Sequence, residues 1–464
     1  MRRCFFIFFL AAYSAFSLSP VAKGALSPVL EKLPNGLQIA WFLNDKLPLV
    51  DLVFVVNSGS RDDAAGKSGT AELLAAVIDK GAAGMSSQEI ARKIESAGAT
   101  RAVSADDETI TIGMHGLAAD AGMLLDMMGK LVLKPDFLDM EVSRERSRIL
   151  DRWRHVGDYG DATAALAFSR ATMNMTVYGR CGLASGKEFS RLSRLDVADF
   201  YKAQFVPGNS LLMVVGRADK EKLKRKITEI FGSWSGGTPR HPDKRYTDPR
   251  LKSLRRGQVI LVDRPGLNQA YLRVGFRAPL ATSPDYYSLS VANALFGEYF
   301  NSRLNLIIRD KLGLTYSIHS GFVYRQEEAV FYVSAATKNE SVGALLKKIT
   351  EALYNLRTGP VSDDEVRTAK DYLIGSFPLG VATLESVASR WLSSTQLGLG
   401  DDFLGKYTAR TALVTQKDVM QALSRHLKTN DAVVVIAGDA HEISKHLTAA
   451  GIKNIKLIAI ADLM

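Results

Sequence analysis

The sequence predicts an α+β fold made of two repeats, and three observations lead to this prediction. A β-β-loop-α order near the start recurs about 220 residues further along the chain. Both halves end on an apolar strand that is closed by glycine and followed by a helix. Long helical patterns at Phe137 to His155, Asp161 to Met173 and Asp363 to Ser376 lie between the strands, which is typical of the α+β class.

The first residues have the pattern of a secretory signal peptide, which we expect at residues 1–24. Met1-Arg2-Arg3 is charged, the stretch from Cys4 to Leu18 is apolar, and small residues follow from Ala22 to Ala25. The apolar stretch is short for a membrane span, and no cysteine stands at the expected cleavage point. We therefore expect an exported protein without a membrane anchor once the signal is removed.

Composition favours a stable globular protein without disulfides. Apolar residues make up 47% of the chain. Cys4 leaves with the signal peptide and Cys181 then stands alone, so stability must come from packed cores. The formal charge of +10 falls to +7 without Arg2, Arg3 and Lys23, and the surplus is spread along the chain. No aromatic-plus-basic pattern accompanies it, so we expect no nucleic-acid partner.

The first repeat is expected at residues 25–236. Its predicted strands, loop, helices and closing strand are, in order, Leu37 to Leu43, Leu49 to Asn57, Ser58 to Gly69, Thr70 to Lys80, Ser87 to Ala97, and Leu211 to Gly216. A linker is expected at residues 237–256, where glycine, proline and charge replace apolar residues.

The second repeat is expected at residues 257–464. The corresponding elements are the strands Gln258 to Asp263 and Ala270 to Phe276, the loop Arg277 to Pro284, the helix Asp285 to Gly297, and the closing strand Ala432 to Gly438. Each repeat therefore presents the same order of elements around its own apolar strands.

A set of short motifs occurs in order along the mature chain. They are Leu33-Pro34-Asn35-Gly36-Leu37, Asn57-Ser58-Gly59-Ser60-Arg61-Asp62, Gly69-Thr70-Ala71, Tyr178-Gly179, Phe200-Tyr201, Pro207-Gly208-Asn209 and Val214-Val215-Gly216. With these motifs the chain resembles the pitrilysin/insulinase family of zinc peptidases, in its short-chain, mitochondrial-processing-peptidase-like branch. The resemblance implies a mostly antiparallel sheet covered by helices in each repeat, with the two repeats facing each other as a clamshell.

The same resemblance implies a zinc site whose ligands are missing here. Active members carry His-x-x-Glu-His on the helix after Gly69, where two histidines bind zinc and the glutamate activates water. In this sequence Glu72 and Ala76 stand at the histidine positions and Ala75 at the general base. The third ligand position falls on Arg152, which has no lone pair to give. We expect no metal in this chain. Glu72 and Arg152 either form an ion pair in the former metal cavity or both point to solvent.

No other chemical site has a recognisable pattern. Of the seven histidines, only His441 and His446 are close neighbours, and five residues apart on a helix they do not share a face well. On the edge strand where active members carry Asn-Ala-x-Thr to pair with substrate, this chain has Arg101-Ala102-Val103-Ser104. Peptide pairing on the first repeat is therefore in question.

The second repeat keeps a pair that the family uses in catalysis. Phe296 to Leu304 and Arg309 to Ser317 resemble the family's second-domain signature, in which an arginine and a tyrosine stand seven residues apart. Arg309 and Tyr316 match them. The resemblance implies that Arg309 holds the substrate backbone and that Tyr316 donates a hydrogen bond to the oxyanion. Read without the resemblance, Tyr316 is a strand residue and Arg309 a helix-end cation.

An erased metal half and a retained Arg/Tyr half are typical of the non-zinc subunit of a heterodimeric peptidase in this family. We therefore expect a periplasmic subunit that is inactive alone. Its partner would be a homologous chain with the zinc motif, which supplies the zinc, and together the two would hydrolyse peptides. The alternative is a non-catalytic peptide-binding or scaffold protein of the same fold.

Overall fold

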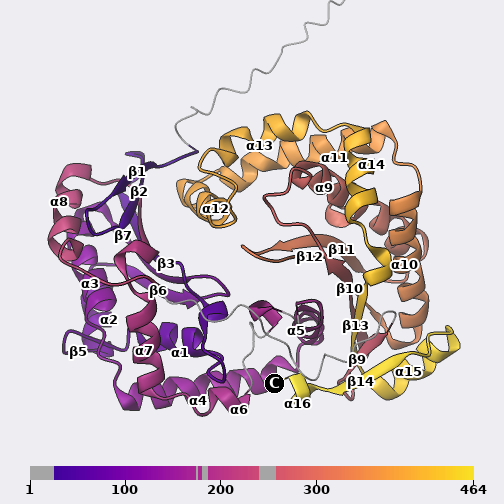
Figure 1. The fold of residues 1–464 in the computed structure, drawn as a ribbon, viewed down its shortest axis with the longest axis horizontal. Helices are drawn as coiled ribbons and strands as arrows, with labels where there is room; N and C mark the ends of the chain where they lie inside the picture. The colour runs from indigo at the N-terminus through magenta and orange to yellow at the C-terminus, as the bar shows by residue number, and fades with distance from the viewer. Residues whose placement is uncertain (1–25, 174–175, 180–185, 240–257, 464) are drawn as a thin grey trace, which may run out of the picture.

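The structure is a computed structural model that describes residues 26–173, 176–179, 186–239 and 258–463. Figure 1 shows two halves, each built on a sheet, that face each other across the centre of the molecule. We call residues 26–239 the N-terminal half and residues 258–463 the C-terminal half. The predicted signal peptide, Cys181 and most of the predicted linker lie outside the described residues.

The α+β class is confirmed, and within the described residues each half contains a six-stranded, mostly antiparallel sheet. In spatial order, the N-terminal sheet consists of β1 (Val29–Lys32), β2 (Gln38–Leu43), β8 (Ser210–Gly216), β3 (Leu49–Val56), β7 (Ile110–Leu117) and β6 (Thr100–Ala105). The C-terminal sheet consists of β11 (Ser317–Tyr324), β12 (Ala329–Lys338), β10 (Gln269–Arg277), β13 (Val433–Gly438), β9 (Val259–Asp263) and β14 (Ile455–Ala459).

Five strands of one sheet correspond in order to five strands of the other, which confirms the internal repeat. The order β6-β7-β3-β8-β2 in the first sheet matches β11-β12-β10-β13-β9 in the second. The closing strands β8 and β13 lie parallel to β2 and β9, as equivalent positions require. The sixth strands differ, because β1 runs antiparallel to β2 whereas β14 runs parallel to β9.

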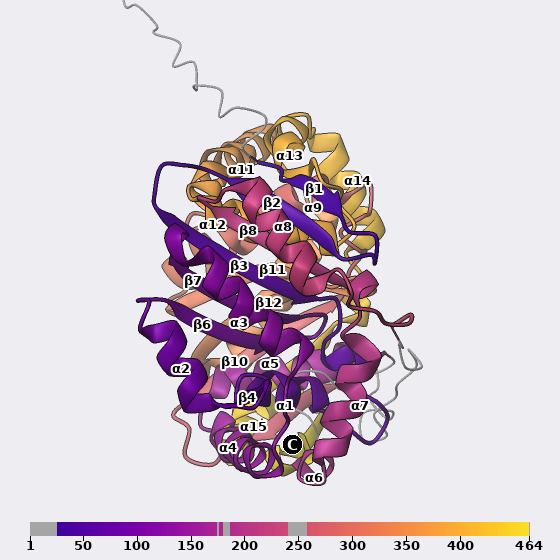
Figure 2. The same ribbon diagram turned by 90° about the vertical axis from the view of Figure 1, so that its left-hand side faces the viewer.

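Helices cover the sheets on both sides. Those of the N-terminal half are α1 (Thr70–Val77), α2 (Ser87–Glu95), α3 (Ala121–Leu133), α4 (Asp139–Val156), α5 (Gly160–Thr172), α6 (Gly186–Phe189), α7 (Arg194–Gln204) and α8 (Lys220–Phe231). Those of the C-terminal half are α9 (Tyr286–Asn293), α10 (Val342–Thr358), α11 (Asp363–Ser376), α12 (Leu384–Gln396), α13 (Phe403–Ala412), α14 (Gln416–His426), α15 (Ala440–Ala449) and α16 (Ile460–Leu463). In Figure 2, α3 and α8 lie in front of the N-terminal sheet, on its outer face.

Shorter elements connect these units. A small hairpin, β4 (Gly81–Ala82) and β5 (Met85–Ser86), follows α1, and two π-helical turns, η5 (Ala294–Glu298) and η6 (Asn305–Lys311), follow α9. The 3₁₀ turns are η1 (Ser60–Asp62), η2 (Ala118–Asp120), η3 (Val177–Gly179), η4 (Pro207–Asn209), η7 (Asn339–Ser341), η8 (Phe377–Val381) and η9 (Thr429–Asp431). No helix in the described part of the chain has both the length and the apolar character needed to cross a membrane.

The closing strand β8 is buried on both faces, which explains its uninterrupted apolar sequence. Successive side chains of a strand point to opposite faces. Leu212 and Val214 join the core under the outer helices, whereas Leu211, Met213 and Val215 join a second cluster on the inner face. A strand that is covered on both sides reads as a continuous apolar run rather than an alternating one.

The two halves exchange the helices that cover their inner faces. The inner face of the N-terminal sheet packs against α12 and α13 of the C-terminal half, with Trp391 at the centre. The inner face of the C-terminal sheet packs against α5 of the N-terminal half through Phe168 and its neighbours. Figure 1 shows α12 beside the N-terminal strands and α5 beside the C-terminal ones. Neither half has a complete core without the other.

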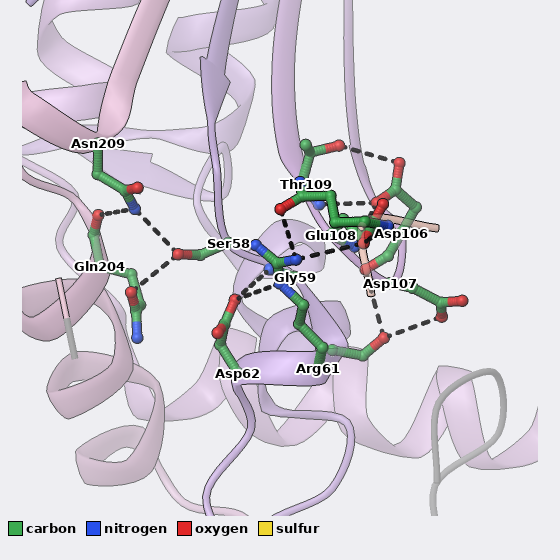
Figure 3. A network of polar contacts seen from close by, with 12 residues as sticks. Ser58, Gly59, Arg61, Asp62, Asp106, Asp107, Glu108, Thr109, Gln204 and Asn209 are labelled. Carbon is green, nitrogen blue, oxygen red and sulfur yellow. Dashed lines mark hydrogen bonds and ion pairs between the residues drawn. The ribbon is translucent and has the colours of Figure 1, made fainter. Parts of the chain in front are cut away.

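Two equivalent hairpins join the halves with polar contacts. The turn between β6 and β7 meets the turn between β11 and β12, where Arg325 Nε lies 2.6 Å from Asp107 Oδ2. The backbone N–H of Gln326 donates to Glu108 Oε1 at 2.8 Å, and Arg61 Nη1 donates to the Gln326 side chain at 2.9 Å. Figure 3 shows Arg61 and residues 106–109 gathered at this junction. The contacts fix the relative position of the two repeats.

Candidate functional site

The helix that carries the zinc motif in active relatives begins at a defined cap. Gly69 has a positive φ of 90°, and α1 starts directly after it at Thr70. The carboxylate of Asp63 accepts hydrogen bonds from the backbone N–H groups of Gly69 at 2.6 Å and Ala71 at 2.9 Å. These are donors that a helix start leaves unpaired, and the negative charge also suits the positive end of the helix dipole. The cap fixes where each side chain of α1 points.

Glu72 and Arg152 form an ion pair between α1 and α4. Arg152 Nη2 lies 2.5 Å from Glu72 Oε1, and the two helices pack against each other. The side chain of Glu72 is 29% exposed and that of Arg152 is 56% exposed. The predicted pairing is therefore confirmed, and the alternative in which both side chains point away to solvent is wrong. That the pair fills a former metal cavity stays a prediction.

The surroundings of Glu72 do not suit zinc. Burial raises the pKa of the Glu72 carboxyl, and hydrogen bonds and charge from Arg152 and the buried Trp153 only partly offset that rise. The carboxylate is committed to a guanidinium, which has no lone pair for a metal. No group of three His, Cys, Asp or Glu side chains that could hold a metal ion occurs among the described residues. The residues at the zinc position therefore do not fit a zinc ion.

The other two motif positions on α1, Ala75 and Ala76, have side chains without a reactive or metal-binding group. Ala75, at the general-base position, is 6% exposed and belongs to the outer core of the N-terminal half. Ala76 is half-buried against the same core. Methyl side chains can neither move a proton nor bind a metal. The face of α1 that would carry the catalytic glutamate is a packing surface here.

The segment that carries Arg309 is anchored by its own motif residues. Arg303 donates from Nε and Nη2 to the two carboxylate oxygens of Glu365, at 2.6 and 2.8 Å, and from Nη2 to the Pro360 carbonyl. Ser302 is fully buried and accepts a hydrogen bond from Asn305 at 3.0 Å. A bidentate arginine–carboxylate contact fixes orientation as well as position. The Ser302-Arg303 motif thus ties η6 to the start of α11.

Arg309 lies on η6 and has two close neighbours. Its Nε donates to Asp310 Oδ1 at 2.8 Å, and its Nη2 lies 3.4 Å from Asp310 Oδ2. Its guanidinium carbon stands 3.7 Å from the centre of the Phe300 ring. The side chain is 17% exposed. The hydrogen bond from Arg309, together with its positive charge, lowers the pKa of the Asp310 carboxyl.

Tyr316 projects from the chain at the start of β11. Its neighbour Thr315 is buried, and the Thr315 hydroxyl bonds the carbonyls of Ser317 and Ala336 at 2.9 and 2.6 Å. With Thr315 held inward, Tyr316 points the opposite way and is 94% exposed. Among the described residues, the phenol contacts no hydrogen-bonding partner. It is the most exposed of the large hydrophobic side chains in the described chain.

The two predicted groups of site residues lie in different halves. Glu72, Ala75, Ala76 and Arg152 belong to helices of the N-terminal half, whereas Arg309 and Tyr316 belong to the C-terminal half. Within the part of the chain that the structure describes, no hydrogen bond or ion pair joins one group to the other.

Arg101, the second residue of the edge strand β6, has an ion-pair partner within the N-terminal half. Arg101 Nε donates to Asp79 Oδ2 at 2.9 Å, and both side chains are largely buried. The guanidinium that replaces the family's asparagine is thus drawn back toward the end of α1. The β6 backbone keeps a free edge in the sheet order.

Sequence reasoning did not identify Phe300, Asp310 or the Arg303–Glu365 contact. Asp310 could have been found, because a carboxylate next to a functional arginine is an obvious partner. Glu365 is 62 residues from Arg303, and only the tertiary fold brings them together. The contact between Phe300 and Arg309 could not be predicted from the sequence, since an aromatic residue in a turn is expected to pack into the core.

Comparison with known proteins places the chain beside M16 peptidases. The model of the "Insulinase (Peptidase family M16)" domain matches residues 43–183, and that of the "Peptidase M16 inactive domain" matches residues 191–373. An uncharacterized zinc protease of Mycobacterium tuberculosis is 25% identical over 406 residues, which is 87% of this chain and 91% of that protein. One of Rickettsia felis is 24% identical over 91% of this chain and 96% of its own length.

Two solved structures share the fold. One, described as a peptidase M16 inactive domain from Pseudomonas fluorescens, has a TM-score of 0.78 at 21% identity and covers 89% of this chain and 98% of its own. The other, a protease from Helicobacter pylori, has a TM-score of 0.80 at 20% identity and covers 89% and 100%. The two domain matches and the distant zinc proteases support assignment of this chain to the pitrilysin/insulinase family.

Proposed function

We propose that this chain of the pitrilysin/insulinase family is the non-zinc subunit of a heterodimeric metallopeptidase in the periplasm of a Gram-negative bacterium. A homologous partner chain with the His-x-x-Glu-His motif would hold the zinc and activate water for peptide hydrolysis. This chain would supply the guanidinium of Arg309 and the hydroxyl of Tyr316 to the shared chamber. The leader sequence supports export, and the family's two-chain members support the pairing.

The observation that carries the proposal is the contrast between the two groups of site residues. At the zinc position the chain has the Glu72–Arg152 ion pair and two alanines, which provide neither a set of zinc ligands nor a general base. The Tyr316 phenol, in contrast, is 94% exposed and without a described partner, seven residues from a held arginine. A phenolic hydroxyl that is exposed in this way is available to donate a hydrogen bond to a group that a partner or ligand brings. The contrast fits a chain that completes another chain's site.

The two side chains have distinct roles in this proposal. Arg309 presents a fixed cation to carbonyl or carboxylate oxygens of the peptide and holds the substrate in place. The Tyr316 hydroxyl donates a hydrogen bond to the oxyanion as the peptide carbonyl becomes tetrahedral. A single donor of this kind typically contributes about 3–4 kcal/mol to transition-state stabilisation. Loss of Arg309 would therefore weaken substrate binding, whereas loss of the Tyr316 hydroxyl would slow turnover.

The alternative is a non-catalytic peptide-binding or scaffold protein. One observation favours it: Leu306, Ile307 and Leu312 near Arg309 are also more than 40% exposed, which would suit binding without chemistry. An apolar surface of this kind serves either function, but only a catalytic subunit needs the Tyr316 hydroxyl. Replacing that hydroxyl therefore separates the two.

The test is co-expression with a homologous chain from the same genome that carries the zinc motif. Hydrolysis of a quenched fluorescent peptide by the purified pair is compared with hydrolysis by the pair carrying Tyr316→Phe. We expect kcat to fall by about 10²- to 10³-fold while the pair stays assembled on gel filtration. A matched control is Tyr354→Phe, because Tyr354 is 60% exposed on α10. Unchanged turnover in the Tyr316→Phe pair would exclude the catalytic role and leave the binding protein.

A further inference from the structure

Arg309 is held on two sides by residues that the proposed function does not use. The ring of Phe300 lies 3.7 Å from the guanidinium carbon and covers one face of the group. Asp310 takes Nε at 2.8 Å and lies 3.4 Å from Nη2, so its carboxylate occupies the side-on edge of the guanidinium. One face and one edge of Arg309 are therefore already occupied.

The remaining donors of Arg309 lie on the side away from Asp310. A guanidinium has five N–H groups, which form a side-on fork at Nε and Nη2, an end-on fork at Nη1 and Nη2, and one further N–H on Nη1. With the side-on fork facing Asp310, the end-on fork is left, and Nη1 meets no acceptor among the described residues. A ligand that binds two donors at once can thus do so at the end-on fork.

Phe300 has no other evident task in the fold. It is 70% exposed and is absent from the hydrophobic clusters of both halves. The contact with Arg309 is its only ring contact among the described residues. An exposed aromatic face beside an arginine attracts the cation through the ring quadrupole and limits its rotamers. Its position is explained by Arg309 rather than by core packing.

We infer that Phe300 and Asp310 are positioning residues that hold Arg309 so that its end-on fork faces the peptide. The group bound there is a peptide oxygen, either a backbone carbonyl or a carboxylate. This inference rests on the proposed function, because it assigns a purpose to the same Arg309. An arginine fixed before the substrate arrives loses less side-chain entropy on binding. The two residues therefore act on substrate binding and leave the chemical step unchanged.

The experiment measures KM and kcat of the co-expressed pair with the quenched fluorescent peptide. The variants are Phe300→Leu, Phe300→Tyr and Arg309→Lys, together with Phe300→Leu in the Arg309→Lys background. Tyr354→Leu serves as the control for loss of an exposed aromatic residue. Because Phe300 is exposed, we expect all variants to fold, which thermal melting of the isolated chain verifies.

We expect Phe300→Leu to raise KM by about two- to fivefold with kcat unchanged, as loss of a cation–π contact and of uniform binding predicts. Phe300→Tyr keeps an aromatic face and should restore KM. In the Arg309→Lys background, Phe300→Leu should add little, since the group that it positions is gone.

Asp310→Asn tests the positioning of Arg309 in a second way, and Asp364→Asn is its control. Asp310→Asn removes the charge that holds the side-on fork, and we expect KM to rise by about two- to fivefold. Asp364→Asn breaks an equivalent exposed contact, the Asp364–Arg367 ion pair on α11, and should leave KM unchanged. A Phe300→Leu effect that persists in full with Arg309→Lys, or no rise of KM in either single variant, would overturn the positioning role alone. Normal KM and kcat in the two-chain complex that carries Arg309→Lys would overturn both this inference and the role of Arg309 in the proposed function.

Discussion

Replacing Trp391 by alanine is expected to destabilise the N-terminal half, although Trp391 belongs to α12 of the C-terminal half. Its side chain is 2% exposed and lies against the inner face of the N-terminal sheet, with its ring 5.6 Å from that of Phe42. Its indole N–H has no hydrogen-bond partner among the described residues, so the substitution removes packing and no hydrogen bond. Truncating a buried tryptophan to alanine typically costs about 3–5 kcal/mol.

The assay uses the tryptophans that remain. The chain has four, and without Trp391 the other three, Trp41, Trp153 and Trp234, all lie in the N-terminal half. Their fluorescence during urea unfolding therefore reports that half. With an m-value of about 3 kcal/mol per molar, the unfolding midpoint should fall by about 1 M or more. The exposed Leu413→Ala serves as the control in the C-terminal half. A midpoint that stays within error of the wild type would refute the exchange of helices between the halves.

Three further outcomes concern Tyr316, the Glu72–Arg152 ion pair and the Arg303–Glu365 contact. The pair carrying Tyr316→Phe should show KM within about twofold of the wild type while kcat falls, since the lost bond is made only in the transition state. Arg152→Ala should cost about 0.5–1 kcal/mol at pH 7 by urea unfolding, and less at pH 4, because protonated Glu72, whose pKa is already raised by burial, no longer needs a cation. Arg303 holds the pKa of Glu365 at about 2, below its unfolded value near 4.3, so the contact stabilises the fold above that value and is lost as pH falls toward 2. Arg303→Met should therefore cost about 1 kcal/mol at pH 7, after allowance for solvent exposure, and almost nothing at pH 2.

The sequence carried enough information to predict the repeat because periodicity and turn residues are local. The apolar run from Leu211 to Gly216 predicted a strand closed by glycine, and its equivalent in the second half followed by comparison. The helix predicted from Asp363 to Ser376 has these bounds in the structure, where Ser362 forms a capping box with Glu365. Such signals lie within a few residues of the element that they define.

The exchange of helices between the two halves could not be predicted from the sequence. An apolar face on a helix predicts that this face is buried, but it does not identify the element that buries it. The sequence from Asp161 to Met173 has the same pattern whether it packs on its own sheet or on the other. Phe168 lies in the N-terminal half of the sequence. Ile260 and Val435, which share its hydrophobic cluster, nevertheless belong to strands of the C-terminal sheet.

The candidate site was predictable to the extent that motifs define positions. Glu72, Arg152, Arg309 and Tyr316 were found by alignment to a family pattern, and the Glu72–Arg152 contact was one of two open alternatives. Neither the exposure of Tyr316 nor the stacking of Phe300 on Arg309 could be read from residue types. Both depend on which way a turn directs its side chains.

The central claim is that this chain completes a zinc site that it does not itself hold. The most direct test is the zinc content per chain and the peptide-hydrolysis rate, measured on this chain alone, on its zinc-motif partner alone and on the pair. We predict one zinc per pair, none on this chain alone, and hydrolysis that requires both chains and the Tyr316 hydroxyl. Stoichiometric zinc and peptide hydrolysis by this chain alone would contradict the account.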